Sequence, residues 1–289
     1  MSTPRRPAPG ASVRAAIDRT RGHDVLLLAA GTTFFAAVAV VPLAFVCVRL
    51  AALVGGDVVT RRITHVLVAV TPSGAGAESA VRSLIDAALA APVSVLAAAV
   101  VPATLYGEGV RRALDRLGSG ARDSGVRRAV RGRVLSLAGL AVVPAGLVLV
   151  AFAGASVVNA ARSGIGGRAL GAYLSFLVMW AISTVALVAT YRLGTPGRPR
   201  ASAGAWGAAA TGSFVAGMTI GLVELLQLPL DYGRFYGGFS AAGLLALTGG
   251  WLWSLHAVVL VGFALTRALD EDDACWRPHR SVGASTRRV

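Results

Sequence analysis

The carboxylate of Glu224 is the group in this chain best placed to do chemistry, because it lies within a long apolar stretch. The stretch covers about residues 203–228, and Glu224 is near its end, in the sequence GLVELLQL. An ionised carboxylate inside a bilayer is costly, so it normally faces a bundle interior or a water-filled cavity. Gly217 and Gly221 precede it on about the same helical face, in a G-x-x-x-G pattern that lets another helix come close. Two interpretations stay open: a substrate or proton site, or a carboxylate at the membrane surface that is solvated or paired with an arginine.

Three further polar residues near the C-terminus are candidates for the same site. His256 lies in the second half of the last apolar stretch, where it could relay protons or simply hydrogen-bond within the bundle. Asp231 and Tyr236 lie between the last two stretches and could line the rim of an outer vestibule. Since consecutive spanning helices run in opposite directions, Glu224 and His256 should lie toward opposite membrane faces. We therefore expect no direct relay between these two side chains.

A group of arginines follows Glu108. Arg111 and Arg112 come three and four positions after it, a spacing that favours ion pairs along one helix. The basic stretch 109–133 could also bind anionic lipid head groups on the cytoplasmic leaflet, or it could serve only to anchor the topology. The candidate head-group contacts are Arg111, Arg112, Arg127 and Arg128.

The residue types do not favour an enzyme. A metal-dependent hydrolase needs clustered ligands, but the four histidines His23, His65, His256 and His279 lie in different segments. A GxxxxGK phosphate loop needs a lysine, and all 28 basic residues are arginines. We therefore predict no catalytic residue, no metal site and no cofactor.

The elements that position these residues are helices in a membrane. The chain has 289 residues, of which 55% are hydrophobic and 15% charged, and its mean hydropathy is +0.67. The first apolar run contains no charged residue, and about 20 apolar residues suffice to cross the hydrocarbon core. We predict an all-α fold, a polytopic membrane helix bundle with about six transmembrane helices. These helices cover approximately residues 25–48, 91–108, 134–158, 169–191, 203–228 and 238–266.

Residues 57–90 carry two shorter amphipathic patterns on either side of the turn sequence TPSGAG. In each pattern the apolar residues recur at helical spacing, whereas the arginines fall off or at the edge of the apolar stripe. Each segment is too short and too polar to span a bilayer. We expect two amphipathic helices lying on the outer side of the membrane.

Small residues recur every four positions in the fifth span. Such a ridge lets helix backbones approach closely, so packing is a better interpretation than a pore lining. Together with the glycines before Glu224, the expected packing positions are Gly204, Gly212, Gly217 and Gly221.

The arginines also predict the orientation. With six spans and the N-terminus inside, 21 of the 28 arginines fall in cytoplasmic segments and seven fall outside, as the positive-inside rule requires. Both termini are then cytoplasmic. The expected organisation is a disordered N-terminal tail over residues 1–22, a membrane domain over 23–268 and a charged C-terminal tail over 269–289. The net charge of +14 therefore indicates topology, and we expect the lipid bilayer as partner and no nucleic acid.

Three stretches, residues 29–45, 190–217 and 236–265, resemble the YihY/BrkB family of bacterial inner-membrane proteins. The first resembles the family's opening span, and the second its tyrosine-arginine exit, basic loop and small-residue fifth span. The third begins with Tyr236-Gly237 and resembles the family's final helix. The resemblance extends over about residues 20–268. The chain departs from the family pattern at Ala264, where an acidic residue is frequent, and at Gly249-Gly250, where bulky residues are usual.

The resemblance implies location in the cell inner membrane and a role in the bacterial envelope. Our leading hypothesis is export or flipping of an envelope lipid or another amphiphile without ATP. A non-transporting scaffold for envelope integrity is the alternative, and the ribonuclease label carried by some relatives comes third. The sequence indicates neither the oligomeric state nor the substrate.

Overall fold

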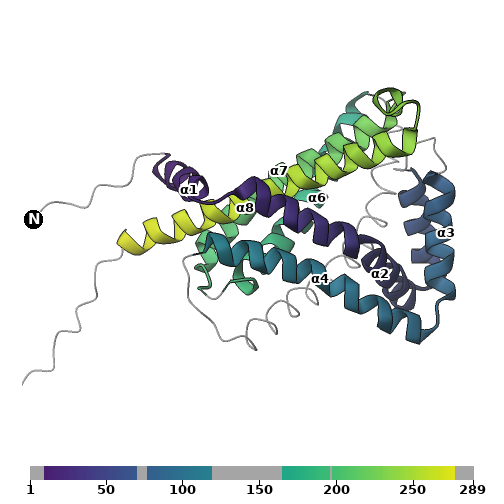
Figure 1. Ribbon diagram of the computed structural model, residues 1–289, viewed down its shortest axis with the longest axis horizontal. Helices are drawn as coiled ribbons and strands as arrows, with labels where there is room; N and C mark the ends of the chain where they lie inside the picture. Colours follow the sequence, from purple (N-terminus) through teal and green to yellow (C-terminus); the bar gives the residue numbers. More distant parts are fainter. Residues whose placement is uncertain (1–9, 70–76, 119–164, 196, 229, 277–289) are drawn as a thin grey trace, which may run out of the picture.

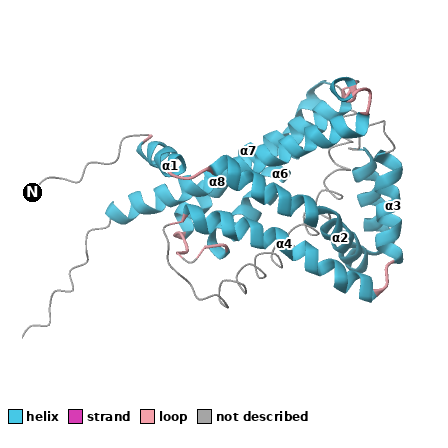
Figure 2. Ribbon diagram, in the orientation of Figure 1, coloured by secondary structure: helices cyan, strands magenta, loops and turns pink. Residues whose placement is uncertain are grey.

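Helices make up all the regular structure of the described residues. The computed structural model describes residues 10–69, 77–118, 165–195, 197–228 and 230–276, and no strand occurs among them. The predicted all-α class is therefore confirmed (Figure 2). The elements are α1 (Ala11–Arg21), α2 (Val25–Ala69), α3 (Ala77–Ala90), α4 (Val93–Leu117), α6 (Ile165–Leu193), α7 (Ala201–Gln227), the 3-10 helix η1 (Arg234–Tyr236) and α8 (Ser240–Trp276).

Five of these helices, α2, α4, α6, α7 and α8, are long and apolar enough to cross a membrane. They fall where five of the six expected spans were placed, because each contains an uninterrupted apolar run of sufficient length. The remaining expected span, over 134–158, lies outside the described residues. Within the described chain, sequence hydropathy therefore located every long apolar helix, although α8 continues further than expected, to Trp276.

The helix α2 contains a sharp turn at Gly56. Its φ of 60° and ψ of −160° lie in a region that favours glycine. Ala51 and Ile63 pack in one buried cluster with Val59, although 12 residues of straight helix would separate them by about 18 Å. The chain therefore folds back at Gly56, so that residues 57–69 form a second, shorter segment of α2.

Helix α3 packs against α2 close to this turn. Ile85 and Ala88 of α3 are buried against Val48 of α2, and the guanidinium of Arg49 donates a hydrogen bond of 2.8 Å to the carbonyl oxygen of Leu89. The two amphipathic segments expected over 57–90 are thus both helical. Their apolar stripes face protein, as the burial of Val59, Ile63, Ile85 and Ala88 demonstrates.

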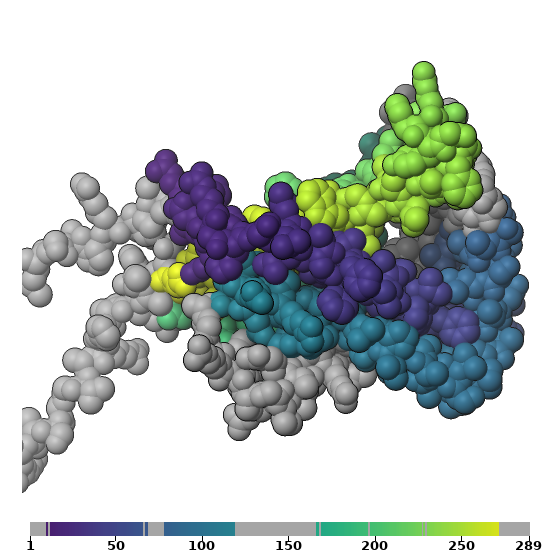
Figure 3. Space-filling view, viewed as in Figure 1, coloured from purple at the N-terminus to yellow at the C-terminus, as the bar shows by residue number. Residues whose placement is uncertain are grey.

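The long helices form two groups that meet at one end of the molecule (Figure 1). The first group consists of α2, α3 and α4, and the second of α6, α7 and α8, with packing contacts inside each group. We call the end where the groups meet the α1 end, and the opposite end, crossed by α3, the α3 end. In the space-filling view a notch separates α8 from α2 toward the α3 end (Figure 3).

The main buried core lies at the α1 end and joins both groups. Ala29 of α2 and Leu114 of α4 pack there with Tyr191 of α6, Ala208 of α7 and Phe263 of α8. The termini of the helices are tied together at the same end, where the carboxylate of Asp270 accepts a 2.9 Å hydrogen bond from the backbone N–H of Arg200, just before α7. An acidic group at a helix N-terminus is electrostatically favourable.

Helix α1 corrects one expectation. Residues 1–22 were expected to be a disordered tail, but residues 11–21 form a helix that lies against α8 (Figure 1). Ala16 is buried between Ala264 and Ala268, and Arg19 pairs with Glu271 at 2.7 Å. Helix α1 therefore docks through the small residue Ala16, because Ala264 and Ala268 of α8 allow close approach.

Candidate functional site

A buried polar junction connects three long helices. His256 of α8 is almost completely buried. Its Nδ1 lies 3.1 Å from the hydroxyl of Thr33 on α2, and its Nε2 lies 3.2 Å from the hydroxyl of Tyr106 on α4. The Tyr106 and His256 rings also make an edge contact, with centroids 5.7 Å apart. We define Thr33, Tyr106 and His256 as the polar junction.

The hydrogen-bond partners determine the tautomer of His256. Nδ1 also lies 2.8 Å from the carbonyl oxygen of Leu252, which can only accept, so Nδ1 carries the hydrogen. The Thr33 hydroxyl donates to the carbonyl of Ala29 at 2.8 Å, and its oxygen shares the single Nδ1 hydrogen with the Leu252 carbonyl. Nε2 of the neutral ring then accepts from the Tyr106 hydroxyl. Every polar hydrogen of the junction is used when His256 is neutral.

The neighbouring residues explain why the junction forms here. Gly109 lies one turn after Tyr106 on α4, and a side-chain carbon added to it would meet the ring of Phe35 on α2 at 2.6 Å. Glycine at this position therefore allows α2 and α4 to approach closely. The indole N–H of Trp253 donates to the backbone carbonyl of Leu26 at 3.1 Å and holds α8 against the start of α2.

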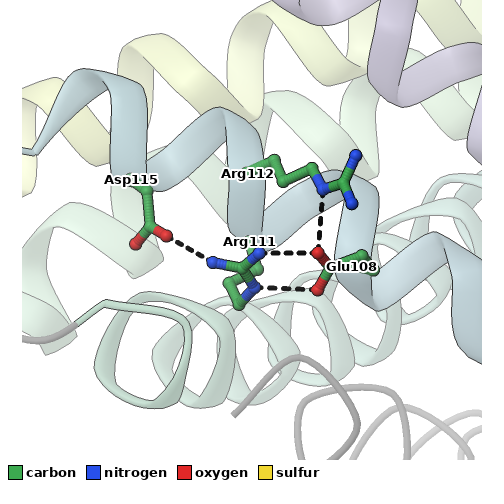
Figure 4. Close-up of polar contacts among 4 residues, drawn as sticks. All are labelled: Glu108, Arg111, Arg112 and Asp115. Atoms are coloured by element: carbon green, nitrogen blue, oxygen red, sulfur yellow. Dashed lines mark hydrogen bonds and ion pairs between the residues drawn. The ribbon is translucent and has the colours of Figure 1, made fainter. Parts of the chain in front are cut away.

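An ion-pair network follows the junction along α4 (Figure 4). The side chain of Arg111 is only 4% exposed. It donates two hydrogen bonds, of 2.8 and 2.6 Å, to the carboxylate of Glu108 and one to the carboxylate of Asp115. Arg112 donates to the same Glu108 at 2.8 Å. The ion pairs expected from the spacing of Glu108, Arg111 and Arg112 are thus present.

This network changes the expected head-group contacts. Nε, Nη1 and Nη2 of Arg111 all bond to carboxylates of its own helix, so Arg111 directs no nitrogen toward a lipid. Arg112 is 65% exposed and keeps free donors. The other two candidates, Arg127 and Arg128, lie outside the described residues.

Glu224 and His256, both candidates for one site, are far apart. The indole of Trp251 on α8 donates to the carbonyl of Met218 on α7 at 3.1 Å, which fixes the pairing of these antiparallel helices. Glu224 then lies beside about residue 245 of α8, and His256 follows about 16 Å further along that helix. The carboxylate of Glu224 is on an exposed part of α7. The structure therefore separates Glu224 from the polar junction, as the sequence indicated.

Asp231 and Tyr236 lie in the connection between α7 and α8, at the α3 end. The carboxylate of Asp231 accepts a 3.0 Å hydrogen bond from the backbone N–H of Gly233 and stabilises the turn. Tyr236 ends the 3-10 helix η1 and is 47% exposed. Both residues are at the surface, and the structure brings neither of them to Glu224 through a hydrogen bond between the described residues.

The four glycines of α7 that were expected to pack differ in how closely a neighbouring residue approaches them. A side-chain carbon at Gly212 would lie 2.7 Å from the hydroxyl oxygen of Thr184, so this position is a tight contact with α6. Gly204 has ordinary contacts with Arg192. At Gly217 and Gly221 a side-chain carbon would meet no described atom within 4 Å, so the packing expected there does not form among the described residues.

The sequence interpretation missed two tighter positions and the two partners of His256. A side-chain carbon at Gly207 would overlap Thr266, and one at Gly262 would overlap Thr211. These residues make the crossing of α7 and α8, but they are not distinguished from other glycines by their spacing. Thr33 and Tyr106 were missed because their partner His256 lies 223 and 150 residues away in the sequence.

Comparisons with known proteins give one family match. The model of the family described as "Virulence factor BrkB" matches residues 16–282. No curated protein and no solved structure gives a significant match. The matched range contains all five long apolar helices, the polar junction and the ion-pair network. The chain is therefore a membrane protein that belongs to the virulence factor BrkB family.

Proposed function

We propose that this protein is a carrier that moves a lipid or another amphiphile between the two leaflets of the membrane without ATP. The observation that carries the proposal is the arrangement of the two helix groups, which pack together at the α1 end and separate toward the α3 end (Figures 1 and 3). A molecule with a polar head and apolar chains needs such an opening, with access from the surrounding lipid.

The placement of the cross-group contacts supports this proposal. Thr33 and Tyr106 meet His256, and Trp253 meets Leu26, all in the half of the bundle nearer the α1 end. Trp251, two residues nearer the α3 end than Trp253, bonds within its own group, to α7. In this proposal the two groups change their separation at the α3 end while the junction holds them at the α1 end.

The proposal places the protein in the inner membrane, with the α1 end on the cytoplasmic side. The sequence assigns 21 of 28 arginines to that side. Helix α4 ends at the α1 end, whereas α6 begins at the α3 end and runs back beside α7 (Figure 1). This alternation supports six spans, with the segment 57–90 outside and both termini inside.

The test is lipid exchange in vesicles. Purified protein is reconstituted into vesicles that carry a fluorescent phospholipid in both leaflets, and a membrane-impermeant reductant removes the fluorescence of the outer leaflet. We expect the reductant to reach nearly all the label with the protein and about half without it. Glu224→Gln tests the exposed acid separately, because loss of exchange in this variant would place Glu224 on the lipid path.

A non-transporting scaffold is the second candidate, and the saturated hydrogen bonding of the polar junction favours it. Each polar group there is already used in bracing one helix against another. A scaffold predicts vesicles whose inner leaflet stays protected even though the reconstituted protein is folded. The same experiment therefore discriminates between the two functions.

A further inference from the structure

A pocket lies between the second segment of α2 and helix α3, away from the polar junction. Its volume is about 560 Å³, which is within the usual range for small-molecule sites. Charged lining residues are Arg61, Arg82 and Asp86, and the apolar lining includes Ile85 and Leu89. The pocket therefore combines both signs of charge with an apolar wall.

The walls of this pocket are fixed by packing. The turn at Gly56 folds the second segment of α2 back on the first, where Val59 and Ile63 are buried. The hydrogen bond from Arg49 to the Leu89 carbonyl holds the end of α3 against the first segment. Because both walls are anchored on the same long helix, the pocket is formed before any ligand binds.

Both arginines of the pocket keep hydrogen-bond donors that are not used within the described protein. Arg61 has no ion-pair or hydrogen-bond partner in the part of the chain that the structure describes. Arg82 uses Nε and Nη2 on the carboxylate of Glu78, at 3.1 and 2.8 Å, which leaves Nη1. Guanidinium groups bind phosphate oxygens through paired N–H donors. This side of the pocket therefore suits a phosphate group.

Three of the remaining polar groups, which also include His65, suit a cation. Asp86 lines the pocket and makes no ion pair with another described residue. The hydroxyls of Thr60 and Thr64 donate to backbone carbonyls of α2, at 3.0 and 2.9 Å, so their oxygens are left as acceptors. An ammonium group has three donors and no acceptor. A carboxylate and two acceptor oxygens provide what such a group needs.

We propose that this pocket binds the zwitterionic head group of an aminophospholipid. The phosphate contacts Arg61 and Arg82, the ammonium group contacts Asp86, and the acyl chains leave along Ile85 and Leu89. A purely anionic head group would place no cation opposite Asp86. This proposal rests on the proposed carrier function. It adds the substrate class and the place where a lipid is held before or after transfer.

Direct binding of short-chain lipids to the purified full-length protein in detergent tests the pocket. The probes are dihexanoyl phosphatidylethanolamine and dihexanoyl phosphatidylglycerol, titrated calorimetrically. We expect the ethanolamine lipid to bind about ten-fold more tightly, as one well-placed charged contact provides. Arg61→Gln should weaken both lipids by a similar factor. Asp86→Asn should weaken only the ethanolamine lipid and so remove the preference.

The chain offers matched controls on the same surface. Arg62→Gln and Asp57→Asn change exposed residues of α2 that do not line the pocket, and both should leave the two affinities unchanged. Equal affinity for the two lipids, or equal effects of control and pocket variants, would overturn the proposal. Competition by inorganic phosphate as effective as that by glycerophosphoethanolamine would also overturn it, because the pocket would then be a simple anion site.

Failure of the pocket and failure of the carrier are separable. Binding is an equilibrium measurement that needs no transfer between leaflets. Selective binding by a protein that exchanges no lipid in vesicles would refute the carrier and leave the pocket. Lipid exchange by a protein without any head-group preference would refute the pocket and leave the carrier. All four substituted residues are exposed, and unchanged unfolding temperatures would establish that the variants are folded.

Discussion

The two ends of the bundle differ in how their helices are held. At the α1 end, a core that includes Leu114, Tyr191 and Phe263 joins both helix groups, and these three side chains are fully or almost fully buried. At the α3 end, Phe235 and Phe239 lie exposed in and beside η1. The difference teaches that the buried contacts between the two groups are concentrated at the α1 end, whereas near α3 the buried contacts lie within the first group.

The largest contrast should come from matched phenylalanine substitutions. Phe263 is 0% exposed and packs on Tyr191 with ring centroids 5.6 Å apart, so Phe263→Ala should cost about 4 kcal/mol through lost packing and an internal cavity. Phe235 is 90% exposed, so Phe235→Ala should change stability very little. Thermal unfolding in detergent measures both variants. A comparable loss in Phe235→Ala would remove the distinction between the ends.

The ion-pair network should give the second largest effect. Arg111→Gln removes the buried guanidinium that bridges Glu108 and Asp115, although Glu108 keeps its pair with Arg112, and we expect a loss of about 3 kcal/mol. Arg112 is mostly exposed, so Arg112→Gln should cost less than about 1 kcal/mol. Denaturant unfolding in mixed micelles compares the two arginines.

The double variant Glu108→Gln/Arg111→Gln is the control for the mechanism. It removes a carboxylate together with the guanidinium, so it should recover part of the stability that Arg111→Gln loses. Glu108→Gln could instead lower the stability of the Arg111→Gln variant by as much as it lowers that of the unsubstituted protein. The loss in Arg111→Gln would then not come from unbalanced charge.

Two glycines of α7 extend the comparison along a single helix. Gly207→Val would force a side chain into Thr266, and we expect overpacking to cost about 2 kcal/mol. At Gly217 an added side-chain carbon meets no described atom within 4 Å, so Gly217→Val should be neutral or slightly stabilising, because valine has the better helix propensity. The unfolding temperatures of the two variants measure this difference. A lower unfolding temperature for Gly217→Val than for Gly207→Val would contradict the distinction between a packed and an open glycine.

Sequence-based prediction succeeds for interactions between residues close in the sequence and fails for interactions between distant ones. Hydropathy located the long apolar helices because each is a local pattern, and spacing predicted the Glu108–Arg111 pair because both residues lie on one turn of helix. Local spacing also placed Gly217 on a packing face, but it carries no information on which face of α7 a neighbour covers. The fold-back at Gly56 and the partners of His256 depend on distant contacts, which no periodicity records.

The smallest contrast concerns single hydroxyl groups. Tyr106→Phe keeps the ring contact with His256 but leaves Nε2 without its donor, so we expect a loss of about 1 kcal/mol. Tyr236→Phe removes a surface hydroxyl at the α3 end and should have no measurable effect. Thr33→Ala removes the other side-chain partner of His256. Because Tyr106 and Thr33 both act through one imidazole ring, their combined effect should differ from the sum of the single effects, and a double-mutant cycle measures that coupling. Simple additivity would mean that the three residues do not act as one junction, and the α1 end would then be held by apolar packing alone.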